Sequence, residues 1–84
     1  MAELLYSWAR LKAVGIGYAM AEVARKRTES PDEPIVAILD AGEDSGLALA
    51  AMHSGADRVL FSGPAATAQK LAQIAAKLGV GFRN

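Results

Sequence analysis

The stretch PIVAILDAGEDSGLALAAMHSGADRVLFSGPAATAQKLAQIAAKLG, residues 34–79, decides the fold of this chain. Its short apolar runs lie between turn residues, as in strands buried in a parallel sheet, and the segments that separate them have helical length. Gly55 and Gly79 each follow a helical segment, where glycine is a common terminator. The pattern predicts, in order, a strand at 35–39, a helix at 45–53, a strand at 58–61, a helix at 64–78 and a short strand at 80–82.

Strands that alternate with helices in this way run parallel, and their crossovers are right-handed in nearly all proteins. The sequence therefore predicts an α/β fold, a small three-layer unit with about three parallel strands. Such a sheet has open edges, and a chain of 84 residues buries only about two thirds of its unfolded surface. We expect the chain to complete its core against a second copy or another protein, as a homo-oligomer or as a small subunit of a complex.

The amino-terminal segment has a helical pattern. Its apolar residues recur at spacings near three and four, which predicts an amphipathic helix over residues 3–27. The residues that carry this pattern are Leu4, Trp8, Leu11, Ile16, Met20 and Val23. Gly15 and Gly17 weaken the helix by on the order of 1 kcal/mol each. They indicate a kink, a break into two helices, or a close crossing of another backbone.

The chain is expected to form one domain over residues 1–84. Residues 28–34 contain two prolines among polar residues, which is typical of a linker. Residues 35–84 then form a βαβαβ unit. The helix over residues 1–27 packs on one face of this unit, projects from it, or is exchanged with a neighbouring copy.

Composition excludes several classes of function. The chain has no cysteine and one histidine, so disulfides and thiolate metal sites are excluded and no metal site is expected. Nine basic and nine acidic residues balance, which disfavours binding to nucleic acid or to an anionic membrane. Arg10, Lys12 and Glu22 interrupt any span that could cross a bilayer, and no signal peptide is present, so a cytoplasmic location is expected. No cofactor motif and no catalytic constellation is present.

Residues 34–78 resemble the last two strand-helix pairs of a response-regulator receiver domain, which has a flavodoxin-like fold. The resemblance lies in PIVAIL, in GLALAAMHSGADRVLFSGP and in AATAQKLAQIAAKL, and its most specific element is Gly55, Ala56 and Asp57. Phosphotransfer is not implied, because no preceding strand supplies a phosphoacceptor aspartate and Gly63 stands where that family has lysine. The string from Gly55 to Gly63 is also similar to phosphate-binding strands of (βα)8 barrels.

The first candidate site is the turn that follows the second predicted strand. Ser62 and Gly63 lie between that strand and the amino terminus of the last helix, with Thr67 one turn further. Ligands of open α/β sheets bind at this edge, and a helix amino terminus attracts anions such as phosphate. The same residues are equally suited to a turn and cap without any ligand.

The second candidate site follows the first predicted strand. Asp40, Glu43 and Asp44 are suited to a hard cation or a general base, but acidic residues are also favoured at a helix start by the helix dipole. Parallel strands end at one edge, so we expect Asp40 and Ser62 to be neighbours. His53 is expected to be a surface residue near a helix end.

Interface residues are expected in the first helix, because aromatic side chains are enriched at protein interfaces. The candidates are Trp8, Leu11 and Met20. The interpretation that best fits the whole sequence is a non-enzymatic assembly or protein-interaction module. The alternative is a small-molecule domain that binds a phosphate-bearing ligand through Ser62, Gly63, Thr67 and Asp40.

Overall fold

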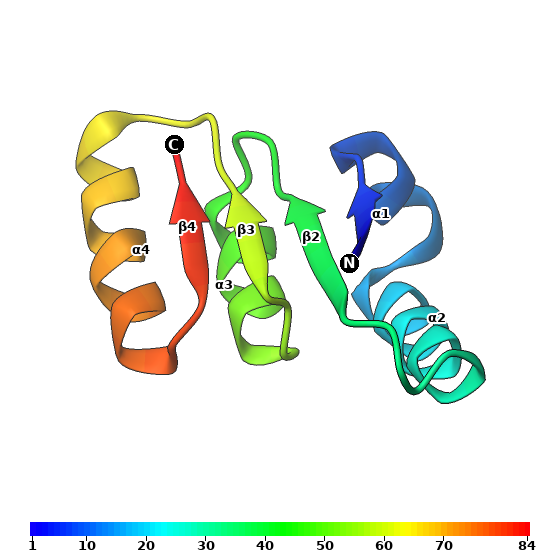
Figure 1. Ribbon diagram of the computed structural model, residues 1–84. Coiled ribbons are helices and arrows are strands. Elements are labelled where there is room, and N and C mark those ends of the chain that lie inside the picture. Colours follow the sequence, from blue (N-terminus) through cyan, green and yellow to red (C-terminus); the bar gives the residue numbers. More distant parts are fainter.

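The computed structural model describes all 84 residues as a four-stranded sheet with four helices (Figure 1). The strands are hydrogen-bonded in the order β1-β2-β3-β4, and every pair is parallel. The expected α/β class with a parallel sheet is confirmed, with one strand more than expected. The elements are β1 (Ala2–Tyr6), α1 (Trp8–Val14), α2 (Ile16–Glu29), β2 (Ile35–Asp40), α3 (Ser45–His53), β3 (Arg58–Leu60), α4 (Ala65–Leu78) and β4 (Gly81–Arg83).

The additional strand is β1, and it corrects the helix expected over residues 3–27. Residues 2–6 are extended and pair with residues 35–39 of β2 in register. Their side chains alternate between buried and exposed, which is the period of a strand. Ser7 then ends the strand and caps α1, because its hydroxyl oxygen accepts a hydrogen bond from the Arg10 amide at 3.2 Å.

Gly15 divides the rest of the expected helix in two. Its φ of 86° and ψ of 154° lie in a region that side-chain-bearing residues almost never occupy. The Gly15 amide ends α1 by donating to the Leu11 carbonyl, and the Gly15 carbonyl begins α2 by accepting from the Ala19 amide. A break into two helices was one of the three expected outcomes. The helix α2 continues to Glu29, so the linker is shorter than expected.

The remaining elements agree with expectation to within one residue at either end. The helix α3 has its expected bounds, and Pro64 is the residue that caps α4 rather than its first helical residue. The strand β2 includes Asp40, β3 ends at Leu60, and β4 lies one residue later than expected.

The helices form a single layer on one face of the sheet, so the expected three layers are two. A sequential strand order with right-handed crossovers places every helix on the same side. The register assigns Leu4, Ala37, Leu39, Val59 and Phe82 to that side, and all of them belong to or pack against the core. The molecule measures 40 × 27 × 17 Å, and in Figure 1 α3 lies behind the strands. The opposite face of the sheet carries no helix.

The core is thin because alanine supplies much of it. Sixteen buried residues form one cluster between the sheet and the helices, and half of them are alanine. The largest fully buried side chains are those of Leu11, Leu39, Val23 and Val59. Small side chains let the helices lie close to the sheet, but each buries little apolar area.

Asp57, which directly precedes β3, connects β2, β4 and α2. Its Oδ2 accepts a hydrogen bond from the Ala37 amide at 2.7 Å and an ion pair from Arg27 of α2 at 2.8 Å. Its backbone amide donates to the Ala37 carbonyl, and its carbonyl accepts from the Gly81 amide. Asp57, one of the three residues of the most specific element named above, therefore holds neighbouring elements together. No helix in the structure is long and apolar enough to cross a membrane.

Candidate functional site

Two cavities lie at the edge of the sheet where the strands end. The smaller, of about 240 Å³, is lined by Asp40, Leu60, Phe61, Ser62, Arg83 and Asn84. Asp40 and Ser62 therefore lie beside the same space, which confirms that these two loops are neighbours. Asn84 closes one side, since its side-chain amide donates to the Phe61 carbonyl at 2.8 Å.

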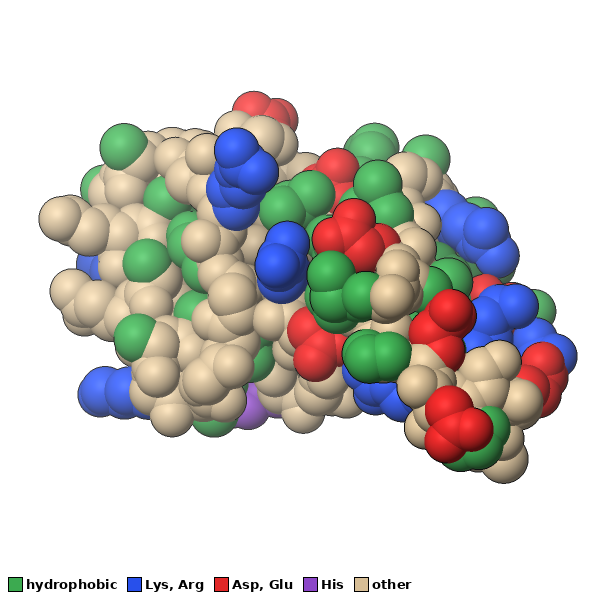
Figure 2. Space-filling view, in the orientation of Figure 1, with side chains coloured by type: hydrophobic (Ala, Val, Ile, Leu, Met, Phe, Trp, Pro, Cys, Tyr) green, Lys and Arg blue, Asp and Glu red, His purple; other side chains and the backbone are tan.

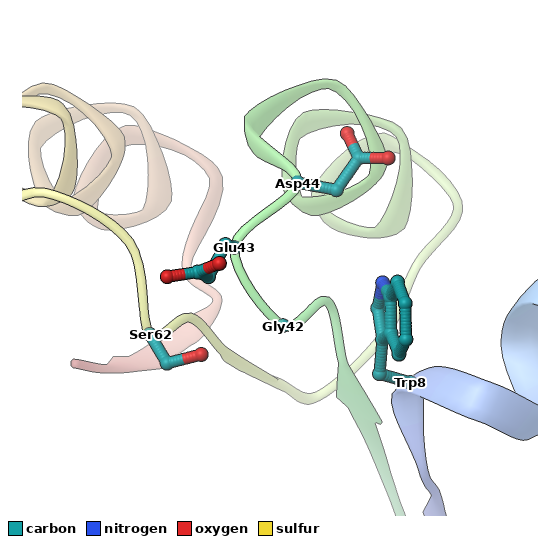
Figure 3. Close-up of a pocket in the computed structure, with 5 residues that line it drawn as sticks. All are labelled: Trp8, Gly42, Glu43, Asp44 and Ser62. Carbon is teal, nitrogen blue, oxygen red and sulfur yellow. The ribbon is translucent and has the colours of Figure 1, made fainter.

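The larger cavity, of about 450 Å³, lies between the β2 and β3 loops and the start of α1 (Figure 3). Its lining residues are Trp8, Gly42, Glu43, Asp44 and Ser62. The indole of Trp8 forms one wall, and the Glu43 side chain lies on the side of the cavity that faces Ser62. Ser62 is the one residue that lines both cavities.

The Asp40 and Asp44 carboxylates are already engaged by their own loop. Asp40 Oδ1 accepts from the Gly42 amide at 2.9 Å, which holds the turn after β2. Asp44 Oδ1 accepts from the Leu47 amide at 2.9 Å and caps α3. The turn and the helix cap therefore account for both carboxylates.

Gly42 brings the turn against Trp8. Its φ is 58°, and a Cβ atom at this position would lie 2.7 Å from Trp8 Cδ1. Only glycine permits both this conformation and this contact. This contact joins the start of α1 to the loop after β2, and no local sequence pattern predicts it.

The charge near Trp8 suits a cation better than an anion. Lys12 Nζ lies 5.3 Å from the Trp8 ring centroid and 4.0 Å from Asp44 Oδ2. The ammonium group of Lys12 thus already contacts the aromatic ring and one of the carboxylates that line the larger cavity. No three acidic or histidine side chains come together to hold a metal ion.

Gly63 and Thr67 do not join Asp40 and Ser62 at the cavities. Gly63 packs against the Phe61 ring, where an added Cβ would overlap the ring atoms. Thr67 is half-buried on α4 and lines neither cavity. The amino terminus of α4 has Pro64 as its cap and no side-chain hydrogen bond. Only part of the expected binding loop therefore faces the space at the strand ends.

The three expected interface residues differ in how deeply they are buried. Leu11 is 1% exposed and belongs to the core of the chain, and Met20 packs partly buried against that core. Trp8 is 43% exposed, at the cavity described above. His53 lies exposed in the last turn of α3.

The side of the sheet without helices is a second candidate surface, which sequence reasoning missed. This open face consists of Glu3 and Leu5 of β1, Val36, Ile38 and Asp40 of β2, Arg58 and Leu60 of β3, and Gly81 and Arg83 of β4. Leu5 is 60% exposed, and Ile38 is the one buried apolar residue outside the core cluster. Figure 2 looks onto this side, where basic and acidic side chains meet among hydrophobic ones.

Charges on the open face have opposite signs at the two ends of the strand order. Glu3 lies on β1 and Arg83 on β4, the two edge strands. Between them, Arg58 Nη1 lies 3.9 Å from Glu3 Oε2, and both side chains are about half exposed. The apolar area of the face comes from Leu5, Val36, Ile38 and Leu60. Asp40 and Arg58 add one charge of each sign on the middle strands, between an acidic edge strand and a basic one.

No protein-family model, curated protein or solved structure matches this chain.

Tyr6 and Glu22 form the most strongly perturbed titratable pair, on the helix side of the sheet. Burial raises the pKa of Tyr6 to about 12, and its hydrogen bond to Glu22 adds to the rise. The same hydrogen bond lowers the pKa of Glu22, with smaller contributions from Arg10 and Arg25. The pair joins β1 to α2 and lines neither of the cavities at the strand ends.

Proposed function

We propose that this protein is a self-associating assembly module whose open face is covered by a second copy of the chain. The observation that carries the proposal is the absence of any helix over the open face. Parallel sheets occur almost only with both faces covered, and their strands are correspondingly apolar on both sides. Here Leu5, Val36, Ile38 and Leu60 supply that second apolar side.

The small size of the core supports the same proposal. Half of the core residues are alanine, and small domains have little stability to spare. Full burial of a leucine contributes about 1.5–3 kcal/mol, and Leu5 has most of its surface still to bury. Covering the open face therefore adds a second apolar layer to a unit that has one.

The test compares two leucines that receive the same substitution. Leu5→Lys places an ammonium group on the open face, and Leu78→Lys places one at the exposed end of α4, where Leu78 is 44% exposed. The molar mass is measured by size-exclusion chromatography with light scattering over a wide concentration range. We expect twice the chain mass for the wild type and for Leu78→Lys, and the single-chain mass for Leu5→Lys.

The expected loss is large because both copies change together. Each copy loses on the order of 1.4 kcal/mol of apolar burial, which raises the dissociation constant by about 100-fold for the pair. A wild type that stays monomeric at every concentration would remove the proposal. Equal masses for the two variants would remove the open face from it.

The alternative function is binding of a phosphate-bearing small molecule at the strand ends. The observation that favours it is that Ser62 lines both cavities and that Arg83 supplies a cation to the smaller one. Its test is the thermal unfolding midpoint with and without inorganic phosphate or a nucleotide, in wild type and in Ser62→Ala. Stabilisation of the wild type that Ser62→Ala abolishes supports this function, because a ligand of the folded state raises stability by mass action.

A further inference from the structure

The two edges of the sheet are complementary to each other. We propose that β4 of each copy pairs in parallel with β1 of the other, which closes two four-stranded sheets into one eight-stranded barrel. This inference rests on the self-association proposed above and specifies its geometry. The helices then lie outside the barrel, and the open face lines its interior.

Unpaired backbone groups are present on both edges. The Ala2 amide donates to the Pro34 carbonyl, so the alternation of a parallel ladder directs the amides of Glu3 and Leu5 away from β2. At the other edge, the Gly81 amide and the Arg83 carbonyl are bonded on the β3 side. The Phe82 amide and carbonyl consequently face the free side of β4. Each edge offers the groups that a further parallel strand needs.

Charge selects which edges meet. A twofold contact between identical edges would place Glu3 beside the partner's Glu3, or Arg83 beside the partner's Arg83. Pairing of β4 with β1 instead brings Arg83 of one copy to the partner's Glu3. Opposite charges on neighbouring strands stabilise a sheet and like charges destabilise it. The acidic and basic edges thus favour the head-to-tail arrangement.

The number of strands favours closure over a growing filament. A head-to-tail contact forms a ring when the rotation closes and a filament when it does not. Eight strands enclose an interior just wide enough for side chains to fill. Leu5, Val36, Ile38 and Leu60 from both copies are the branched apolar residues that such an interior needs. The interior also receives Glu3, Asp40, Arg58 and Arg83, two acidic and two basic side chains from each copy, of which Glu3 and Arg58 already form an ion pair. Closure at two copies also leaves neither free edges nor an exposed apolar face.

The closed barrel completes the smaller cavity at the strand ends. That cavity lies beside β4, where Arg83 and Asn84 form its outer side. A β1 strand added at this edge passes beside Arg83, so the partner's β1 borders the space already lined by Ser62. The site is therefore composite, and one copy supplies only part of its wall.

Amide hydrogen exchange of the wild type tests the pairing directly. The probes are the outward amides of Glu3, Leu5 and Phe82, measured below and above the concentration at which light scattering detects assembly. We expect their exchange to slow by at least about tenfold on assembly, as amides do when a ladder forms around them. Assembly with these amides still exchanging as in the monomer refutes barrel closure but retains self-association through stacked faces. A monomer at every concentration refutes both.

A charge exchange gives the second test. Glu3→Arg and Arg83→Glu each place like charges at both contacts of a homodimer, and each is expected to lower assembly by at least about tenfold. An equimolar mixture of the two variants restores opposite charges at both contacts and is expected to assemble as the wild type does. Lys70→Glu, on the exposed side of α4, is the matched control and leaves assembly unchanged. A mixture that stays monomeric, with both variants folded by circular dichroism, overturns the edge pairing.

Discussion

Removal of the Asp57 side chain tests how the strands are held together at their amino ends. In Asp57→Ala, the Ala37 amide loses a carboxylate partner at 2.7 Å, and Arg27 loses its ion pair at 2.8 Å. Ala37 is fully buried, so solvent cannot readily replace the lost acceptor. We expect the free energy of unfolding to fall substantially.

The magnitude follows from the two interactions. A hydrogen bond to a charged group contributes about 1.5–3 kcal/mol. The ion pair is about two-fifths exposed on both sides, so it contributes at most about 1 kcal/mol. We therefore expect Asp57→Ala to cost about 2–3 kcal/mol. Asp57→Asn keeps an oxygen acceptor for the Ala37 amide and is expected to cost about 1 kcal/mol or less.

The assay is urea unfolding of both variants and the wild type, followed by circular dichroism at one fixed protein concentration. The concentration must be fixed because self-association would otherwise change the apparent stability. A cost below about 0.5 kcal/mol for Asp57→Ala would refute the role of the hydrogen bond. Equal costs for the two variants would show that charge, and not the acceptor, is what matters.

Three further outcomes follow from particular contacts. The pKa of Tyr6 is raised from 10.0 to about 12, so the folded state favours the neutral phenol. The stability that its pair with Glu22 contributes is therefore present below pH 10 and lost as pH rises toward 12. Tyr6→Phe should remove this alkaline loss of stability in urea unfolding. The lowered pKa of Glu22 acts oppositely, with stability present above pH 4.5 and lost as pH falls further, and Glu22→Gln should flatten that acid limb. Gly42→Ala forces a Cβ against Trp8, so we expect a shifted tryptophan emission and a loss of about 1–3 kcal/mol, whereas unchanged emission would contradict the close contact.

Most of the α/β unit was predictable because its signals are local. Apolar runs between turn residues located β2 and β3, and glycines located the ends of α3 and α4. The strand β1 was missed because it is an edge strand with one side exposed. Its Leu4 lies four residues before Trp8, which is helical spacing. The five residues of the strand, with their period of two, therefore also fit the start of a longer helix.

Two signals could have separated the strand from the helix. Ser7 is a favoured helix cap immediately before Trp8, and Glu3 and Leu5 alternate with the buried side chains of β1. The single layer of helices was not predictable, because it depends on strand order, which local patterns do not specify. Once the order is sequential, the open face follows from right-handed crossovers.

The neighbourhood of Asp40 and Ser62 was predictable from the rule that parallel strands end at one edge. The Trp8 wall of the larger cavity was not, because it depends on a contact between α1 and the β2 loop. That contact requires Gly42 at a positive φ, which the sequence does not distinguish from any other turn glycine.

The sequential strand order has a consequence for how the chain acquires its structure. Each strand is hydrogen-bonded only to the strands that precede and follow it along the chain. No segment from elsewhere in the chain has to insert between two strands that already pair. The amino-terminal part of the chain is synthesised first, so each newly made strand follows the strand with which it pairs. We expect the protein to fold in the order in which the ribosome makes it, with β4 the last strand to dock.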